Sequence, residues 1–395
     1  MIRENFHEKI ALMLGVLILT NYLFLSLNFS EMIIKINFII FIFILITFYF
    51  KNFFENIYLK IFFLIIIFIS LGTPTFEWDP RSLWLFHAKR IFYDNSIFSV
   101  ADNYAKFSQN DLPTLIPAFS SSLATVVGYW NEVFPKISFS LAFLPPLILF
   151  YAYLKKTTYI AYLSIVLFTI GKYLFNGWAD GLLAVYFGSS LFIMYIFVIK
   201  EKNIISDNIL SYFIAITFFT ILTLIKNEGS ALLLVLFTTS ILTKIYYKEF
   251  KKNIFKFLIL SLSLIPIFFW KYFCYSNGIS YNHFVNENTL FNLLTRYDDI
   301  KNYLQISYFI FLNEKVIICF VFFLLSFLMN YNKKLFEFIL FSVLLYIIIL
   351  FFVYLSTPYD FYWQLNSTAA RVVKSISFSF AFIGLYNLND KKIFS

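Results

Sequence analysis

The chain has 395 residues, of which 61% are hydrophobic and 13% are charged, about half the charged fraction of a soluble domain. This composition excludes a water-soluble globular protein and predicts an all-α, polytopic integral membrane protein. The Lys and Arg residues behind the net charge of +9 lie in short clusters between apolar runs, so membrane lipids are expected partners and nucleic acid is not.

Apolar runs long enough to cross a bilayer recur along the whole chain. A hydrocarbon core needs roughly 20 apolar residues per helix, and bordering charges mark the helix ends. About twelve transmembrane helices are expected, near residues 10–27, 33–50, 58–73, 137–154, 157–174, 181–199, 207–225, 230–247, 254–272, 315–331, 335–354 and 373–388. With no internal repeat or linker between them, residues 1–395 are expected to form a single integral membrane domain.

Basic residues between these runs indicate the orientation, because short cytoplasmic loops carry an excess of Lys and Arg. Five connections qualify: Lys155-Lys156, Lys200-Glu201-Lys202, the run 248–252, Lys333-Lys334 and the tail Lys391-Lys392. Both termini are then cytoplasmic, in the cell membrane of a bacterium (its inner membrane). The loops 74–136, 273–314 and 355–372 are expected on the extracytoplasmic side.

The segment 112–130 is apolar enough to span, yet it contains Pro113, Pro117 and Gly128. If it crossed the membrane, every later basic connection would move outside. We therefore expect a juxtamembrane or re-entrant helix, packed in protein or lining a wet cavity, since irregular backbone is not tolerated in contact with lipid.

The first long loop opens with two acids and a helix signal. Asp79 followed by Pro80 is typical of a helix N-cap and first position, and the spacing then places Trp84 and His87 on one side. Glu77 and Asp79 could supply a carboxylate base at the membrane surface. The simpler interpretation is a capped interfacial helix with an aromatic and basic belt. Cations within reach of an anionic headgroup are Arg81, Lys89 and Arg90.

Further charges lie where later spans return to the same surface. Asp180 follows one span, and Lys226 and Glu228 follow another. Charges at the edge of an apolar run are costly unless they are paired or functional, although Lys226 and Glu228 could simply neutralise each other. Near the last span, Asp360 precedes Arg371, whose planar guanidinium suits phosphate.

Aromatic and polar residues of the later loops allow two interpretations. Tyr362 and Trp363 could stack on a sugar or belong to an interfacial belt. The loop 273–314 holds charged residues without a recognisable spacing, to which we assign substrate specificity: His283, Glu287, Arg296, Asp298 and Asp299.

Several catalytic motifs are missing from the sequence. It contains no GxxxxGK[ST] phosphate loop, no HExxH and no GxSxG, which argues against ATP hydrolysis and against protease or esterase chemistry. Charges inside the predicted spans are few, which argues against an ion-coupled transporter.

In order and type, the motifs of residues 74–230 resemble the GT-C superfamily. These are multi-span glycosyltransferases that use polyprenyl-phosphate sugars, including the protein O-mannosyltransferase and lipid A aminoarabinose transferase group (family 39-like). The likeness rests on the acids that open the first loop, the basic and aromatic juxtamembrane helix, the proline segment 112–117 and Asp180. The region of Arg371 resembles bacterial relatives more loosely.

The resemblance implies inverting transfer of a sugar from a polyprenyl-phosphate donor to a glycan, lipid or protein acceptor at the extracytoplasmic face. It assigns the catalytic base, or a metal partner, to Asp79 with Glu77 as the substitute, and a second acidic role to Asp180. Donor phosphate would be bound by Arg81, Lys89, Arg90 and Arg371, and substrate by Trp84, His87, Lys226, Glu228 and Asp360.

This sequence departs from the family pattern in two respects. Glu77-Trp78-Asp79 replaces an adjacent acidic pair, and three spans precede the loop where one is usual, so the identity of the base stays open. No cofactor is assigned, and a divalent metal is left open.

Two other functions remain as alternatives. An O-antigen ligase or polymerase would place an essential Arg and His in the later loop, at Arg296 and His283. A lipid-linked-sugar flippase or other transporter would line the middle of the bundle with charges. An outward groove that brings Asp79 and Asp180 together would favour an enzyme over a scaffold.

Overall fold

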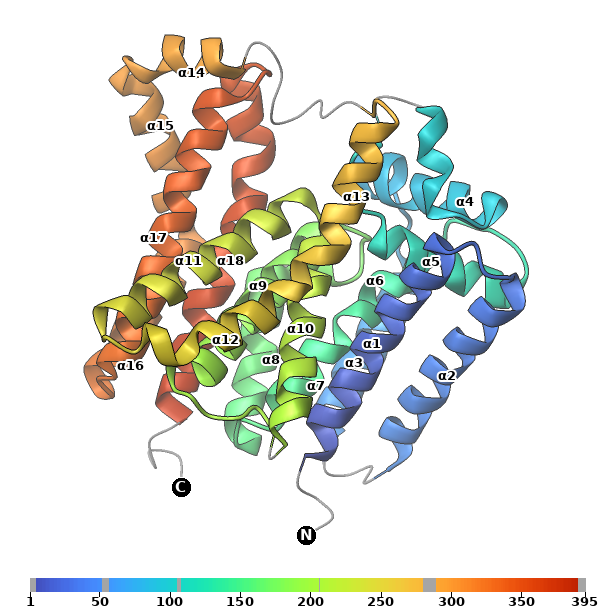
Figure 1. Ribbon diagram of the computed structural model, residues 1–395, viewed down its shortest axis with the longest axis horizontal. Coiled ribbons are helices and arrows are strands. Elements are labelled where there is room, and N and C mark those ends of the chain that lie inside the picture. Colours follow the sequence, from blue (N-terminus) through green and yellow to red (C-terminus); the bar gives the residue numbers. More distant parts are fainter. Residues whose placement is uncertain (1–4, 52–56, 105–107, 206, 280–288, 390–395) are drawn as a thin grey trace.

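The computed structural model describes residues 5–51, 57–104, 108–205, 207–279 and 289–389. Every regular element within these ranges is helical (Figure 1). Many of the helices are long and apolar, as the membrane interpretation requires. The prediction of an all-α polytopic membrane protein is therefore confirmed for this part of the chain.

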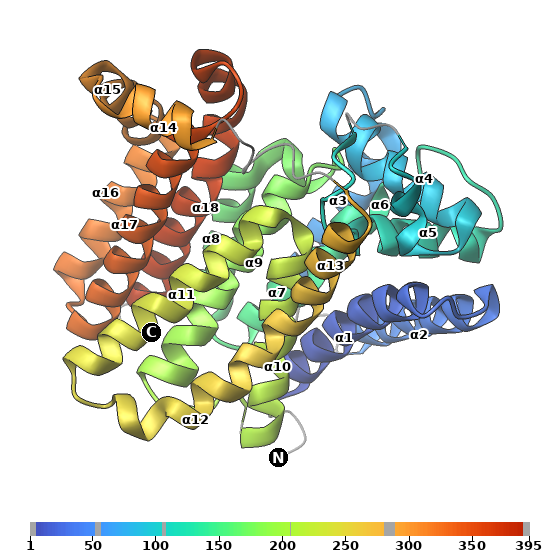
Figure 2. The ribbon, with the colours of Figure 1, turned by 45° about the horizontal axis from the view of Figure 1, so that its top comes forward.

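The N-terminal third combines three apolar helices with the short helices of the first long loop. Its elements are α1 (Phe6–Ser26), α2 (Glu31–Phe50), α3 (Ile57–Gly72), η1 (Pro80–Trp84), α4 (Leu85–Asp94), η2 (Ile97–Asp102) and α5 (Leu115–Val127). Helix α5 packs against α1, α2 and α4, and Figure 2 shows α1 and α2 lying side by side beneath it. Its residues 115–122 are all buried, so the expectation of a short helix packed in protein is confirmed.

The middle of the chain forms the core of the bundle. It comprises α6 (Ile137–Ala142), α7 (Leu144–Tyr151), α8 (Lys156–Ile170), η4 (Gly171–Leu174), α9 (Ala179–Met194), η5 (Tyr195–Ile199), α10 (Asn208–Ile225), α11 (Asn227–Tyr246), α12 (Phe250–Ser261), η6 (Leu262–Leu264) and α13 (Ile265–Ser276). Every residue of α9 is buried, and α9 contacts α10, α11 and α18. A small residue on α9 allows α18 to approach closely, since a Cβ on Gly188 would meet the Phe378 ring of α18 at 2.6 Å.

The C-terminal helices form a second bundle beside α9. They are α14 (Thr289–Tyr297), α15 (Ile300–Phe311), α16 (Glu314–Met329), α17 (Lys333–Ser356) and α18 (Phe361–Asn389). Helix α18 packs against α9 and α16, and α14 packs against α17. The last helix thus joins this bundle to the buried centre of the molecule.

All twelve predicted spans coincide with helices, but the count of about twelve is not confirmed. Among the described residues, nine helices are long and apolar enough to cross a membrane, or ten if α15 and α16, which are bent by 67°, form one span. The shorter helices at 57–72 and 137–151 fall below that length. In the second of these, Pro145 and Pro146 lie in the first turn of α7 and interrupt the helix.

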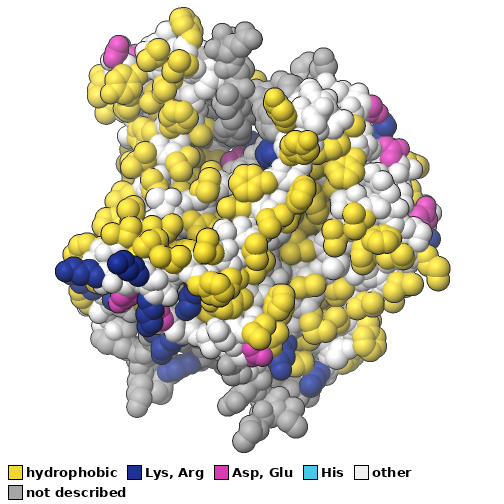
Figure 3. All heavy atoms as spheres, viewed as in Figure 1, with side chains coloured by type: hydrophobic (Ala, Val, Ile, Leu, Met, Phe, Trp, Pro, Cys, Tyr) yellow, Lys and Arg dark blue, Asp and Glu magenta, His cyan; other side chains and the backbone are white. Residues whose placement is uncertain are grey.

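Four of the five basic connections lie at one end of the molecule, where α1 begins and α18 ends (Figure 1). The backbone N–H of Lys155 donates to Asn389, Lys252 pairs with Glu201, and Lys334 pairs with Glu249. Figure 3 shows Lys and Arg side chains gathered at this end. The fifth connection, Lys391-Lys392, lies outside the described residues. The prediction that these loops share one end is confirmed, and their cytoplasmic assignment stays a prediction.

Candidate active site

A cavity of about 1040 Å³ lies at the other end of the molecule, between α17, α18 and the segments that begin η1, α9 and α11. Figure 3 shows the surface hollowed here, with charged side chains at the base of the hollow. From Ala179 to Ile199, α9 and η5 run 21 residues, about 30 Å, and so separate the cavity from the basic end by roughly the thickness of a hydrocarbon core.

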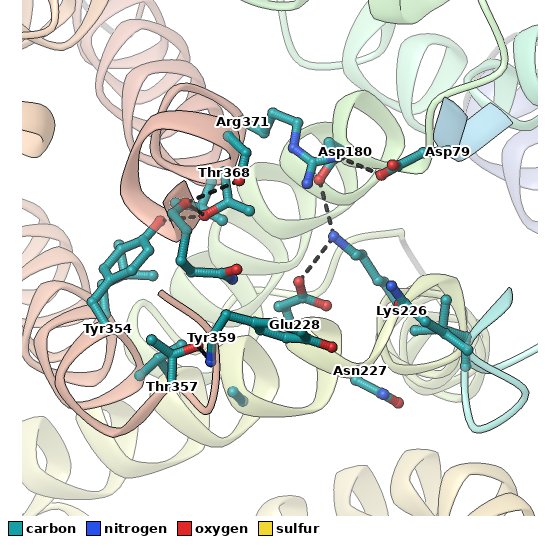
Figure 4. Close-up of a pocket in the computed structure, with 18 of the residues that line it drawn as sticks. Asp79, Asp180, Lys226, Asn227, Glu228, Tyr354, Thr357, Tyr359, Thr368 and Arg371 are labelled. Atoms are coloured by element: carbon teal, nitrogen blue, oxygen red, sulfur yellow. Dashed lines mark hydrogen bonds and ion pairs between the residues drawn. The ribbon is translucent and has the colours of Figure 1, made fainter. Parts of the chain in front are cut away.

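Three carboxylates and two cations alternate along one wall of the cavity (Figure 4). Arg371 pairs with Asp79, and its Nη1 lies 3.9 Å from Asp180 Oδ2. Lys226 Nζ lies 3.1 Å from Asp180 Oδ1 and 2.9 Å from Glu228 Oε1. None of these five side chains is more than 20% exposed. Their attraction is therefore weakly screened by water, and three acids against two bases leave one net negative charge.

Several buried polar atoms of this wall have no hydrogen-bond partner among the described residues. Within the described residues, Asp180 Oδ2, Glu228 Oε2 and Arg371 Nε are buried and make no hydrogen bond. The Arg371 guanidinium also lies 4.6 Å from the centre of the Trp178 ring. A buried polar atom without a partner costs about 1–3 kcal/mol, so these atoms indicate a site that a polar ligand completes.

Burial and neighbouring charges shift the pKa values of the two site residues that lie outside the candidate spans. Burial raises the pKa of Asp79, Arg371 opposes this shift, and Asp180 adds to it. Burial alone would lower the pKa of Lys226, but Asp180 and Glu228 raise it well above its ordinary range. Lys226 is therefore a permanent cation at neutral pH, whereas Asp79 holds its proton more tightly than an ordinary Asp.

Helix ends position the acids of the wall. Asp180 and Glu228 lie in the first turns of α9 and α11, where the helix dipole favours negative charge. Lys226 is the single extended residue between α10 and α11, with φ −161° and ψ 158°. The turn is tight because Gly229 approaches α10, and a Cβ on it would lie 1.9 Å from Leu222 O.

Replacing Gly229 with Ala should therefore lower the free energy of unfolding by about 1–3 kcal/mol. The added methyl group meets backbone, which cannot move aside as a side chain would. Thermal denaturation in detergent would measure the change. Gly72→Ala is the matched control, because nothing lies within 4 Å of its Cβ position; equal melting temperatures for both variants would contradict the steric argument.

Helix α18 presents Arg371 differently from the prediction. The expected final span began at residue 373, whereas the helix begins at Phe361, so Arg371 projects from its interior. Hydropathy fails here because one face of the first turns is polar and lines the cavity. Asp360 lies outside the lining, where it accepts a hydrogen bond from the backbone N–H of Trp363 at 2.8 Å and so caps the helix.

Asp79 does not cap the helix that follows it. The element η1 begins at Pro80, but Asp79 already has helical backbone angles (φ −59°, ψ −51°), and its side chain makes no capping hydrogen bond. Its carboxylate pairs with Arg371 instead. A helical turn on one side and a cation on the other thus fix Asp79 at the edge of the cavity.

Glu77 is close in sequence to Asp79 but has different partners. Its carboxylate pairs with Lys172 and accepts hydrogen bonds from Trp178 Nε1 and, at 3.1 Å, from Asn176 Nδ2. It does not line the cavity. The choice between the two acids, which the sequence left open, is thereby weighted toward Asp79.

Trp84 and His87, which were predicted on one side of the helix that follows Asp79, face the protein interior. Trp84 and His87 are each 1% exposed, and neither lines the cavity. The His87 ring nitrogens lie 2.8 Å from the Tyr104 hydroxyl and 2.7 Å from Ser108 O, and burial lowers its pKa to about 4. The spacing was correct, but the shared side is a core face and not a substrate face.

The basic residues predicted to bind donor phosphate are only partly brought together. Arg81 and Lys89 are exposed away from the cavity lining. Arg90 pairs with Asp94 and Asp102 and lies 4.8 Å from the Tyr104 ring centre. Of the four predicted cations, Arg371 alone lines the cavity.

Arg296, one of the two residues that the ligase alternative requires, is held by backbone groups and does not line the cavity. Arg296 donates to the backbone carbonyls of Thr357 and Tyr359 at 2.8 and 3.1 Å, and thus ties α14 to the end of α17. His283 and Glu287 lie outside the described residues. Asp299 accepts from the backbone N–H of Lys301 at 2.9 Å and caps α15.

Some cavity residues were not predicted from the sequence. Thr368 and Gln364 precede Arg371 by one and two helical turns, and Tyr354 binds Thr368 through their hydroxyls at 3.0 Å. Had the predicted last helix been extended toward the N-terminus, the spacing of Gln364 and Thr368 would have placed them on the same side as Arg371. Asn227 was also missed, and it donates to Asp111 Oδ2 at 2.9 Å across 116 residues of sequence.

The acids of the wall do not fit a metal ion as they stand. Each is paired with Arg371 or Lys226, so cations of the protein already occupy the space between the carboxylates. Among the described residues, no group of three or more His, Cys, Asp or Glu side chains could hold a metal.

No family model, curated protein or solved structure matches the chain. Its function must therefore be inferred from the cavity and the residues that line it.

Proposed function

We propose that the protein is a GT-C-type glycosyltransferase that moves a sugar from a polyprenyl-phosphate donor to an acceptor at the extracytoplasmic face of the membrane. The observation that supports this most is the chain of paired charges from Asp79 through Arg371, Asp180 and Lys226 to Glu228, in a cavity at one end of an apolar bundle. A scaffold would have no need of five paired charges gathered in one cavity.

In the proposed reaction, Asp79 accepts the proton of the acceptor hydroxyl or amine as that group attacks the anomeric carbon. The bond between the sugar and the phosphate oxygen breaks, and the phosphate leaves with the electron pair. Arg371 stabilises the negative charge of the leaving phosphate. Attack from the face opposite the leaving group inverts the anomeric configuration.

The remaining cavity residues support these two. Asp180 lies between Arg371 and Lys226 and holds both cations toward the cavity. Along α17, Ile349, Leu350 and Val353 give the cavity an apolar side suited to an apolar part of the substrate. The acceptor stays open among glycan, lipid and protein.

The proposal is tested by assaying the purified protein with a panel of polyprenyl-phosphate sugars and isolated cell-envelope acceptors. Transfer of label from one such donor supports it. Absence of transfer from every donor by folded protein, together with movement of a lipid-linked sugar across a vesicle membrane, would instead favour the transporter alternative.

Adding EDTA to that assay should leave the rate of transfer unchanged. Arg371 and Lys226 occupy the positions from which a metal would neutralise phosphate charge, so the chemistry we propose needs none. The rate is measured before and after chelation, and then with added Mg²⁺ or Mn²⁺. Loss of transfer with EDTA and recovery with either metal would contradict the arrangement of cations described above.

A further inference from the structure

Three lysines from separate elements gather outside the cavity. Lys172 lies in η4, Lys315 in the first turn of α16 and Lys374 in α18, and none of them lines the cavity. Trp178 lies between the charged wall and this group. Its ring centre is 4.6 Å from the Arg371 guanidinium and 5.4 Å from the centre of the Tyr173 ring.

The positions of the three ammonium groups follow from their aromatic and backbone partners. The Nζ atoms of Lys374 and Lys172 lie 4.3 and 6.0 Å from the centre of the same Tyr173 ring. Lys315 Nζ donates to Phe168 O at 2.7 Å, one helical turn before Lys172. Helix α18 packs against both α8 and α16, and Lys172 and Lys374 share the Tyr173 ring, so the three cations lie in one region of the protein.

Lys374 is the residue that makes this cluster unusual. It is 8% exposed, and within the described residues it makes no hydrogen bond or ion pair, only the contact with Tyr173. Asp180 attracts it, but that carboxylate pairs with Lys226 and lies beside Arg371. A charge on a largely buried side chain without an anionic partner is costly, and two neighbouring cations add to the cost.

The acids closest to the cluster do not neutralise Lys374. Glu77 pairs with Lys172, and Glu314, beside Lys315 in the first turn of α16, is exposed. The positive end of the α16 dipole reinforces the field of the lysines. An anion at this point would relieve the repulsion and supply the missing acceptors.

We propose that Lys374, Lys315 and Lys172 bind a phosphate group, either from the headgroup of an anionic phospholipid or as free phosphate. Phosphate carries several acceptor oxygens and forms charge-assisted hydrogen bonds with ammonium groups. None of the three lysines lines the cavity, so the proposal does not depend on the glycosyltransferase function and stands or falls separately from it.

The test measures binding to the full chain, purified in a neutral detergent, with three probes: dioctanoyl phosphatidylglycerol, dioctanoyl phosphatidylcholine and inorganic phosphate. Affinities are measured by native mass spectrometry and by ligand-induced shifts in melting temperature. Lys374→Met and Lys315→Met should each weaken binding of the anionic probe about tenfold or more, since a charge-assisted hydrogen bond is lost. Lys301→Met, at an exposed lysine of α15, is the matched control and should bind like the unaltered chain.

Lys374→Met should melt no lower than the unaltered chain when no ligand is present, because it removes an unpaired charge from a largely buried side chain. Weaker binding of the anionic probe to this variant is then not a result of unfolding. Lys315→Met, at a less buried position, gives a second measurement of the same loss of binding. Preference for phosphatidylglycerol over inorganic phosphate assigns the site to a lipid headgroup, and the reverse assigns it to free phosphate. Equal binding by all variants, or no binding of either anion, would overturn the proposal.

Discussion

Replacing Asp79 with Asn should lower the rate of sugar transfer about 10²–10⁴-fold, the contribution expected of a positioned general base. Asn keeps the shape of the side chain and can still accept a hydrogen bond from Arg371, but it cannot take up a proton. The rate is measured with the purified variant and the polyprenyl-phosphate sugar that the unaltered chain uses. The variant should also melt close to the unaltered chain, because Asp180 remains beside Arg371.

Glu77→Gln provides the matched control for this prediction. The amide oxygen of the new side chain would still accept hydrogen bonds from Trp178 and Asn176, and only the ion pair with Lys172 would be lost. Because that pair is about half exposed, its loss should change stability little. Full activity of Asp79→Asn, with Glu77→Gln inactive, would transfer the role of base to Glu77.

The pH dependence should carry the signature of Asp79. A base works only when it is deprotonated, so transfer should fall as the pH falls through the raised pKa of Asp79. Arg371 opposes that rise in the free protein, and a bound phosphate would draw Arg371 away and add negative charge. The acid limb of kcat should therefore lie at higher pH than the acid limb of kcat/KM. Identical limbs would indicate that Arg371 does not bind the donor phosphate.

The sequence was sufficient for most of the fold. Each predicted span coincides with a helix because the period and length of apolar runs are local properties. It was insufficient for the start of α18. The first turns of that helix are polar on the side that lines the cavity, so hydropathy placed the start of the helix about three turns too late. It was also insufficient for the span count, since breaks such as that before Asn313 depend on packing and not on composition.

The candidate site was predictable in part, for an equally physical reason. Sorting charges by membrane side identified Asp79, Asp180, Lys226, Glu228 and Arg371, because all five lie where predicted spans reach the same membrane surface. The same sorting could not tell which residues near Asp79 turn inward. His87 and Trp84 fill the core, and Glu77 holds the loop that carries Trp178. Such distinctions depend on the direction of each side chain in the folded chain.

The second large effect is expected at Arg371, which lies beside both Asp79 and Asp180. Replacing it with Gln leaves Asp79 and Asp180 buried with fewer positive partners, and breaking a buried pair in this way costs about 3–5 kcal/mol. Transfer should fall about 10²–10³-fold, because the leaving phosphate loses its main source of charge stabilisation. Thermal denaturation and the donor KM separate the two effects.

Arg371→Lys tests whether charge alone is enough. A Lys keeps the positive charge but loses the planar fork and the stacking on Trp178, so donor binding should weaken while stability is largely kept. Arg90→Lys is the matched control, since Arg90 is also paired with two acids but lies outside the cavity. Activity of Arg371→Lys equal to that of Arg90→Lys would show that the fork is not used.

The double variant Arg371→Gln with Asp79→Asn distinguishes a structural pair from a catalytic one. Removing both partners leaves fewer unpaired buried charges than removing Arg371 alone, so the double variant should recover part of the lost stability. It should not recover transfer, because both the base and the phosphate ligand are gone. Recovery of transfer along with stability would mean that Asp79 and Arg371 only hold the cavity together. The proton acceptor would then be another acid of the wall, of which Glu228 is more exposed than Asp180.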